Sequence, residues 1–279
     1  GFGCSVPAIL STRRIETRSD RLVTIAVLPM MSCAGRLPIY MMFVSALFPS
    51  RLQAPVLFGI YASGVLLALC CARLLKNTLF KAPQRDSLHH MKRLRLPSLR
   101  KVGILMWSRA FMYVRKAGTF ILGASIILWF LNTYPRPEEN TAPTNAAAME
   151  HSYAGQIGHW MEPVTQVAGF DWKINSALVG AFAAKEIFVT QMGILYAVED
   201  GNSGPAAQQT LNARLKASYT PLQGISIMIF CLIALPCIGT VTVAKREAGT
   251  WWFALAQFGG LTLLGFATAT LIYQAGLLL

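Results

Sequence analysis

The sequence predicts an all-α integral membrane protein, a polytopic helical bundle in which several helices are broken. Of its 279 residues, 54% are hydrophobic and only 13% are charged, whereas about a quarter of the residues of a soluble domain carry charge. Proline and glycine recur inside several of the apolar segments. A freed backbone amide or carbonyl is costly in hydrocarbon, so a broken helix persists only where protein or a water-filled cavity satisfies it. Breaks of this kind mark substrate paths.

Residues 1–48 hold two apolar pieces, each interrupted beside a cysteine. Cys4 lies in the run GFGCSVP, close to Pro7, and Cys33 lies in the run PMMSCAGRLP. Arg36 in the second run is predicted to be an intramembrane or interfacial cation. It either snorkels or caps the broken helix, or it lines a path.

The charges of the connecting segments predict the topology, because cytoplasmic loops are rich in Lys and Arg. The formal net charge of +13 comes from basic residues that are concentrated in such loops. This distribution favours a polytopic membrane protein over a nucleic-acid-binding protein. Segment 76–116 has eleven cations and a single acid, Asp86. Part of it, residues 96–118, resembles an interfacial amphipathic helix that feeds the next span. His89 and His90 are adjacent in this loop and are either solvated or metal-binding.

About six spans follow from the hydropathy. The expected organisation is a broken span in 1–48, two spans in 49–134 joined by the basic cytoplasmic loop 76–116, an extracytoplasmic loop 135–173 with a short surface helix over 152–169, one span in 174–198, a cytoplasmic loop 199–221, and two spans in 222–279. Alternation places the short link AKREAGTW, residues 244–251, outside. The last span is rich in small residues that allow close helix packing: Gly259, Gly260, Gly265 and Ala269.

Two charged residues lie near the centre of the span in 174–198. Lys185 and Glu186 are neighbours in sequence and cannot face each other on one helix, so each needs another partner. Intramembrane ionisable groups are costly enough to be functional candidates, and the alternative is a structural ion pair with another helix. We expect Glu186 to be a buried carboxylate. A further break follows in LPCIGTVTV, where Pro236 and Gly239 flank Cys237.

Four motifs, in this order, carry a family resemblance: GFGCSVPAILSTR, PMMSCAGRLPIY, GAFAAKEIFV and LPCIGTVTVAKREAGTW. Together they resemble the C-terminal part of the transmembrane region of the bacterial ferrous iron transport protein B family, FeoB, and the resemblance covers essentially the whole chain. It implies a multi-pass protein of the bacterial cytoplasmic (inner) membrane with two Gate motifs. It also implies GTP hydrolysis on an N-terminal G domain, since this chain has no GxxxxGK[ST] phosphate loop.

The resemblance implies a transient path for Fe²⁺ along four residues. Cys4, Cys33 and Cys237 take the membrane cysteine positions of the family, and Glu186 takes the acidic position of the second Gate motif. Thiolate and carboxylate ligands, with carbonyls freed by the breaks, suit this ion, although a membrane cysteine can also merely pack. Residues predicted to line or gate the path are Ser5, where the family commonly has Asn, and Pro7, Arg36, Lys185, Pro236 and Thr240.

The implied cargo is Fe²⁺, and no cofactor is expected in this chain; GTP and Mg²⁺ belong to the G domain. Expected partners are the lipid bilayer, the G domain of the same protein, small cytoplasmic Feo accessory proteins and further copies of the chain, but no nucleic acid. The chain does not begin with Met, and we expect it to be part of a longer protein. A Phe among small residues occurs in both GFGC, residues 1–4, and AFAA, residues 181–184, which suggests inverted repeats.

Two other functions stay open. A Gate-fold transporter of nucleosides or other organic solutes predicts polar, aromatic pockets rather than cysteines. A non-transporting membrane scaffold predicts that the cysteines only pack.

Overall fold

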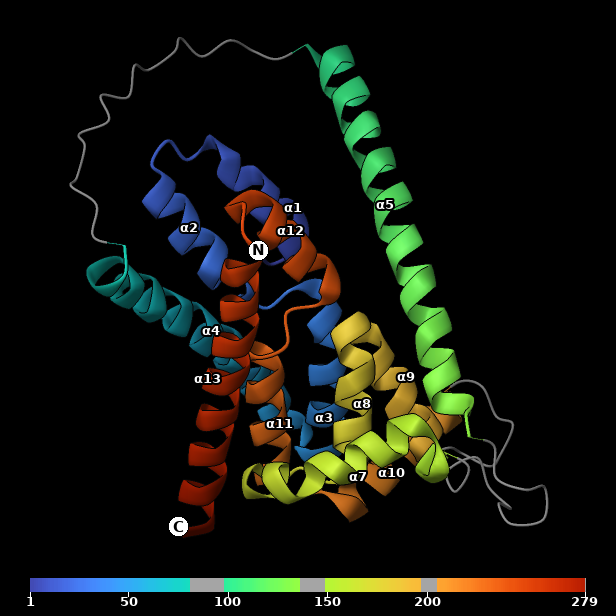
Figure 1. The fold of residues 1–279 in the computed structure, drawn as a ribbon. Helices are drawn as coiled ribbons and strands as arrows, with labels where there is room; N and C mark the ends of the chain where they lie inside the picture. Colours follow the sequence, from blue (N-terminus) through green and yellow to red (C-terminus); the bar gives the residue numbers. More distant parts are fainter. Residues whose placement is uncertain (81–97, 136–148, 197–204, 279) are drawn as a thin grey trace.

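The structure is a computed structural model that describes residues 1–80, 98–135, 149–196 and 205–278 (Figure 1). Within these ranges the secondary structure is helical, with no strand. The predicted all-α class is therefore confirmed. His89 and His90 lie outside the described residues, as do residues 81–97 of the basic loop in which they occur.

Four helical stretches in the described residues are long and apolar enough to cross a membrane. Two are continuous, α4 (Ser50–Thr78) and α13 (Trp251–Leu278). The other two are broken: α2 (Arg18–Val27) is followed by α3 (Leu37–Leu47), and α11 (Pro221–Ile233) is followed by α12 (Ile238–Ala248). Both breaks fall where proline and glycine predicted them. The second span expected in 49–134, after the basic loop, and the span expected in 174–198 are not among these four stretches.

The predicted interfacial helix and the span after it are one element. Helix α5 runs without interruption from Leu99 to Thr133 and lies along one edge of the molecule in Figure 1. Its C-terminal end meets the helix α7 (Tyr153–Thr165), where the Tyr153 amide donates to the Tyr134 carbonyl at 2.9 Å. Helix α7 confirms the short helix expected within residues 152–169.

The expected single span of residues 174–198 is instead a hairpin of two short helices. Helix α8 (Trp172–Ala183) ends at Ala184, whose backbone is extended (φ −149°, ψ 134°), and α9 (Lys185–Leu195) begins directly after it. The two helices pack side by side, and a Cβ at Gly180 of α8 would collide with Gln191 Oε1 of α9. The expectation of a long continuous helix is wrong here because the chain turns back at Ala184.

Contacts at the base of the hairpin put both of its arms at the same end of the molecule. The Tyr219 hydroxyl donates to Asp171, which precedes α8, and the Tyr196 hydroxyl, which follows α9, donates to Tyr219 at 2.9 Å. We call this region the Asp171 end. Loops 135–173 and 199–221 were expected on opposite sides, but the Tyr219–Asp171 contact places them together. The helix α10 (Pro205–Ser218) also lies here, against the end of α3.

At the opposite end of the molecule, arginine side chains connect the N-terminal segment to α12. Arg13 makes a two-point ion pair with the carboxylate of Glu247, and Arg21 donates to the Glu247 carbonyl oxygen. Lys76, near the end of α4, pairs with Asp20 at 3.0 Å. This region is the arginine end. The link AKREAGTW was expected opposite the basic segment around Arg13, and the Arg13–Glu247 pair shows that they share one end.

The directions of the helices follow an inverted order. Helix α1 (Ser5–Ser11) runs from Cys4 to the arginine end, and the chain then passes through α2, α3 and α4. Helix α9 runs from Ala184 to the Asp171 end, and after α10 the chain passes through α11, α12 and α13. Each series has a half-helix, a broken span and a continuous span, and the two series run in opposite directions. This arrangement supports the predicted inverted repeats.

Candidate functional site: the broken centre

The predicted cysteines lie at the starts of helices beside the breaks. Cys4 is the N-cap of α1, Cys33 is the N-cap of a 3-10 turn (Ala34–Arg36) that leads into α3, and Cys237 is the N-cap of α12. Each has extended backbone angles and no side-chain capping hydrogen bond. The three predicted cysteines therefore share one local setting, the start of a helical turn beside a break.

Contacts join these breaks to one another. The Ala34 amide donates to the Gly3 carbonyl oxygen at 3.0 Å, which links the first two breaks. Val6 of α1 touches Gly239 of α12, with 3.6 Å between Val6 Cγ2 and the position of a Cβ on Gly239. Segments far apart in sequence thus come together. We call the region where the breaks beside Cys4, Cys33 and Cys237 meet the broken centre.

The tip of the α8–α9 hairpin completes this centre. Lys185 Nζ donates to the Ala234 carbonyl oxygen in the break between α11 and α12, at 3.2 Å. Glu186 lies over the break between α2 and α3, where a Cβ on Gly35 would be 2.6 Å from Glu186 Oε1. The charged groups of these two adjacent residues therefore contact two different breaks. A glycine at position 35 leaves room for the carboxylate.

Two cations are buried near these breaks. Arg36 is 2% exposed and Lys185 is 5% exposed. Arg36 donates to the Met31 carbonyl oxygen at 3.0 Å, so it caps the broken helix as one reading of the sequence expected; it does not snorkel to a surface. Its Nε has no hydrogen-bond partner among the described residues.

Glu186 differs from its expectation, because the structure leaves it exposed rather than buried. It lies in the first turn of α9, where the helix dipole stabilises a negative charge. The ion pairs found in the described ranges do not include Lys185 or Glu186. The alternative of a structural ion pair is therefore not what holds either side chain in place here.

The remaining predicted residues are spread around the same breaks. Ser5, Pro236 and Thr240 are buried, and Pro7 is exposed. Cys237 Sγ lies 3.2 Å from Thr240 Oγ1 one turn into α12. Within the described residues no group of three or more His, Cys, Asp or Glu side chains is arranged to hold a metal ion. The proposed contacts of Cys4, Cys33, Cys237 and Glu186 with the ion thus stay a prediction about successive positions.

Several residues of the centre were not singled out from the sequence. Leu235 has a positive φ of 53°, a conformation that costs a non-glycine residue energy and that clusters at functional sites. Gly265 of α13 packs against Ala234, whose Cβ and N would lie 2.7 and 3.1 Å from a Cβ on the glycine. Ala184 forms the hairpin tip without Pro or Gly. The similarity of AFAA to GFGC was the sequence feature that could have indicated a break at Ala184. The proline beside Leu235 was the feature that indicated the break there.

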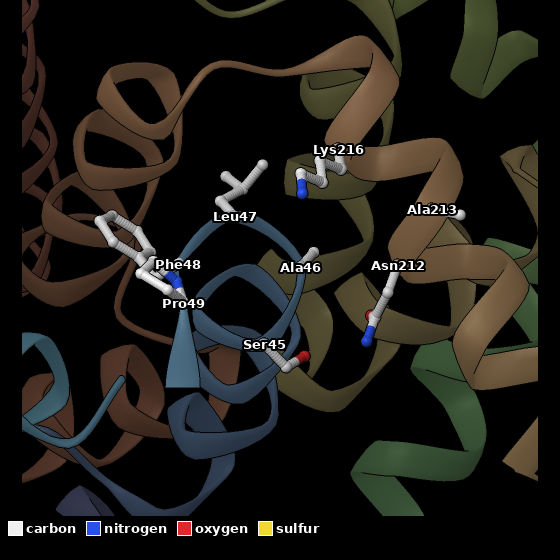
Figure 2. Close-up of a pocket in the computed structure, with 8 residues that line it drawn as sticks. All are labelled: Ser45, Ala46, Leu47, Phe48, Pro49, Asn212, Ala213 and Lys216. Carbon is white, nitrogen blue, oxygen red and sulfur yellow. The ribbon is translucent and has the colours of Figure 1, made fainter. Parts of the chain in front are cut away.

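A separate hollow of about 340 Å³ lies at the Asp171 end rather than at the breaks. Figure 2 shows it between the end of α3, at Ser45 to Pro49, and the α10 residues Asn212, Ala213 and Lys216. It contains none of the predicted site residues. Its lining has no aromatic pair facing across it, so it does not favour the nucleoside-pocket alternative.

These features define the class of the protein. A multi-pass helical membrane protein with broken spans and a hairpin that meet at mid-molecule, in two oppositely directed series, has the architecture of a membrane transporter. Two family models match the chain: Gate, described as nucleoside recognition, over residues 114–251, and the ferrous iron transport protein B C terminus over residues 57–109.

Similar proteins agree with both models. An Fe(2+) transport protein A/Fe(2+) transporter FeoB fusion protein of Porphyromonas gingivalis is 36% identical, over 100% of this chain and 37% of the relative. The Fe(2+) transporter FeoB of Campylobacter jejuni is 37% identical over 92% of the chain and 42% of the relative. That of Methanocaldococcus jannaschii is 36% identical over 100% of the chain and 41% of the relative. No solved structure gave a significant match.

The chain belongs to the FeoB family and matches the C-terminal part of its members. It spans less than half the length of the curated relatives named above. Together with the apolar helices, this identifies a multi-pass inner-membrane protein.

Proposed function

We propose that this chain is the permeation part of a ferrous iron uptake transporter and that Fe²⁺ passes through the broken centre. One observation carries the proposal: Cys4, Cys33 and Cys237 each start a helix at a break. Soft thiolates favour borderline divalent ions over Mg²⁺ or Ca²⁺. Glu186 beside Gly35 supplies a carboxylate next to the Cys33 break.

The breaks also supply oxygen ligands. The carbonyl oxygen of the extended Ala234 accepts from the Lys185 side chain, and once released it can replace part of a hydration shell, as in other transporters with discontinuous helices. Thiols must lose a proton to bind a metal, so binding of the ion to these cysteines releases a proton. The ion then binds at separate positions in turn, and this arrangement favours transport over stable binding at one site.

GTP, Mg²⁺ and the accessory proteins bind to other parts of the longer protein. The relatives are more than twice as long as the matched region, and we propose that a G domain lies in the remainder. The name of the Porphyromonas gingivalis relative joins Fe(2+) transport protein A to the transporter. This supports a small accessory protein as a partner.

The decisive experiment is Fe(II) uptake by the full-length protein in proteoliposomes with and without GTP. We expect uptake that depends on GTP and is not competed by nucleosides. Competition by a nucleoside would favour the organic-solute alternative. Unchanged uptake after simultaneous Cys4→Ser, Cys33→Ser and Cys237→Ser substitution would remove the cysteine path.

We further propose that the arginine end faces the cytoplasm, because the cations of residues 13–21 gather there with those of the α12–α13 link. A topology reporter inserted after Ser218 should then read extracytoplasmic, and one inserted at residue 140 should give the same result. Opposite results for the two insertions would contradict the hairpin. A reporter near residue 249 should read cytoplasmic.

A further inference from the structure

Lys185 is a cation held inside the break of the second broken span. Its ammonium is almost fully buried and donates to the Ala234 carbonyl oxygen at 3.2 Å. Ala234 itself is completely buried, and the next residue, Leu235, has a positive φ. Among the ion pairs of the described ranges, none gives Lys185 a carboxylate partner.

The groups around Lys185 are those that a divalent cation would take. Besides the Ala234 carbonyl, its electrostatic neighbours include the thiols of Cys33, Cys231 and Cys237. These come from the break between α2 and α3, from α11, and from the break between α11 and α12. Among the described residues, the ammonium donates a hydrogen bond to the Ala234 carbonyl oxygen and to none of these sulfurs.

The remaining charge nearby does not offset the ammonium. Arg36 is a second buried cation among the electrostatic neighbours of Lys185. Glu186, the adjacent carboxylate, lies over Gly35 at the other break instead. A divalent ion at the same carbonyl would therefore meet a repulsion twice that between two unit charges, in a region where water screens poorly. The ammonium and the ion cannot occupy this position together.

We infer that Lys185 is a tethered cation that closes the path: its ammonium occupies the Ala234 carbonyl oxygen, and it must withdraw before Fe²⁺ can bind there. The inference rests on the proposed function, since it describes how that path is kept shut. The hairpin provides the means of withdrawal. Lys185 is the first residue of α9, directly after the extended Ala184, so movement of the hairpin tip carries the ammonium with it.

A purely structural role for Lys185 predicts something different. If the bond to Ala234 only anchors the hairpin, its loss reduces folded protein and lowers transport. If the ammonium closes the path, its loss lets ions pass without nucleotide while the protein stays folded. Nucleotide-independent influx is therefore the discriminating readout, because a structural anchor would not raise it.

The test uses the full-length protein in proteoliposomes and compares Fe²⁺ influx with and without GTP. The variants are Lys185→Met, which removes charge and donor, and Lys185→Gln, which keeps a donor for the Ala234 carbonyl. We expect influx without GTP to rise about tenfold or more in both, equivalent to ~1.4 kcal/mol of lost closure. Lys173→Met is the matched control, since Lys173 lies over the Tyr196 ring at the Asp171 end, away from the breaks.

Each outcome has a separate meaning. If the folded Lys185 variants show no more Fe²⁺ influx without GTP than the wild type, the tethered-cation inference is overturned, and the proposed transport function stays intact. Loss of folded protein in both variants would assign Lys185 to structural support and overturn it as well. A wild-type protein that shows no GTP-dependent Fe²⁺ uptake would instead overturn the proposed function, and the closure inference with it. An equal rise in the Lys173→Met control would also overturn the inference, because loss of a lysine charge far from the breaks would then have the same effect.

Discussion

The broken and the continuous spans differ in how far the rest of the protein covers them. In the apolar windows of the broken spans, α2–α3 and α11–α12, 44% and 56% of the residues are buried, whereas the figure is 17% for both α4 and α13. Large side chains such as Phe58 on α4 and Leu263 on α13 are 76% and 71% exposed. The continuous helices satisfy their own backbones and can face lipid, but the broken ones need protein around them.

The same comparison separates two kinds of cysteine. Cys33 and Cys237 start helices at breaks and are partly buried, while Cys70 lies exposed on the continuous helix α4. Residue type alone does not distinguish these cysteines. Their position relative to freed backbone does, and the following predictions test this difference in order of expected effect.

The largest effect should come from the cysteines at the breaks. Cys33→Ser and Cys237→Ser should each lower Fe²⁺ uptake about tenfold or more, since ~1.4 kcal/mol of lost ion stabilisation suffices. Cys70→Ser and Cys71→Ser, on α4, should leave it unchanged. Uptake is measured with the full-length protein and corrected for expression. Equal, small effects at all four positions would contradict the cysteine path.

Glu186→Gln should have the next largest effect. It keeps shape and hydrogen bonding but removes the charge beside Gly35, and we expect uptake to fall about fivefold, the effect of ~1 kcal/mol. Folded protein should be unaffected, because Glu186 is exposed and has no ion-pair partner among the described residues. Near-normal uptake by a folded variant would make Glu186 scaffolding. GTP-dependent uptake in Lys185→Met should fall less than in Glu186→Gln.

A third prediction concerns how a continuous span supports a broken one. Gly265→Ala places a methyl group 2.7 Å from Ala234 Cβ and 3.1 Å from its amide nitrogen, and overpacking of this kind costs ~1–3 kcal/mol. Gly260→Ala on the same helix meets nothing within 4 Å and should gain up to about 1 kcal/mol from helix propensity. Thermal unfolding in detergent should therefore shift in opposite directions. A destabilised Gly260→Ala would contradict the packing argument.

The smallest effect is a pH dependence at the Asp171 end. Burial raises the pKa of Asp171, although the Ile174 amide, the Tyr219 hydroxyl and Lys173 act against this. The folded state then binds more protons than the unfolded one between the ordinary pKa, about 3.9, and the raised pKa. Stability should therefore fall as pH rises through that window. Asp171→Asn should remove this slope in unfolding midpoints, and Tyr219→Phe should widen the window; an unchanged slope in Asp171→Asn would contradict the assignment.

The sequence by itself determined where two of the spans break and which residues lie there. Proline and glycine beside Cys33 and Cys237 act locally, because proline removes a hydrogen-bond donor and clashes with the preceding turn. The same local signals placed Cys4 at a helix start. The continuous apolar runs of α4 and α13 could likewise be predicted from length and composition.

Only the tertiary structure decided the direction of the chain after those local signals. Nothing in residues 181–186 forbids a continuous helix, since Ala184 is a good helix former, so the turn there depends on packing of α8 against α9. The shared ends depend on pairs distant in sequence, Tyr219 with Asp171 and Arg13 with Glu247. Charge counting assigns sides by assuming that every apolar segment crosses, and a hairpin that enters and returns violates that assumption. Contacts between distant segments settle the matter because they alone fix which loops meet.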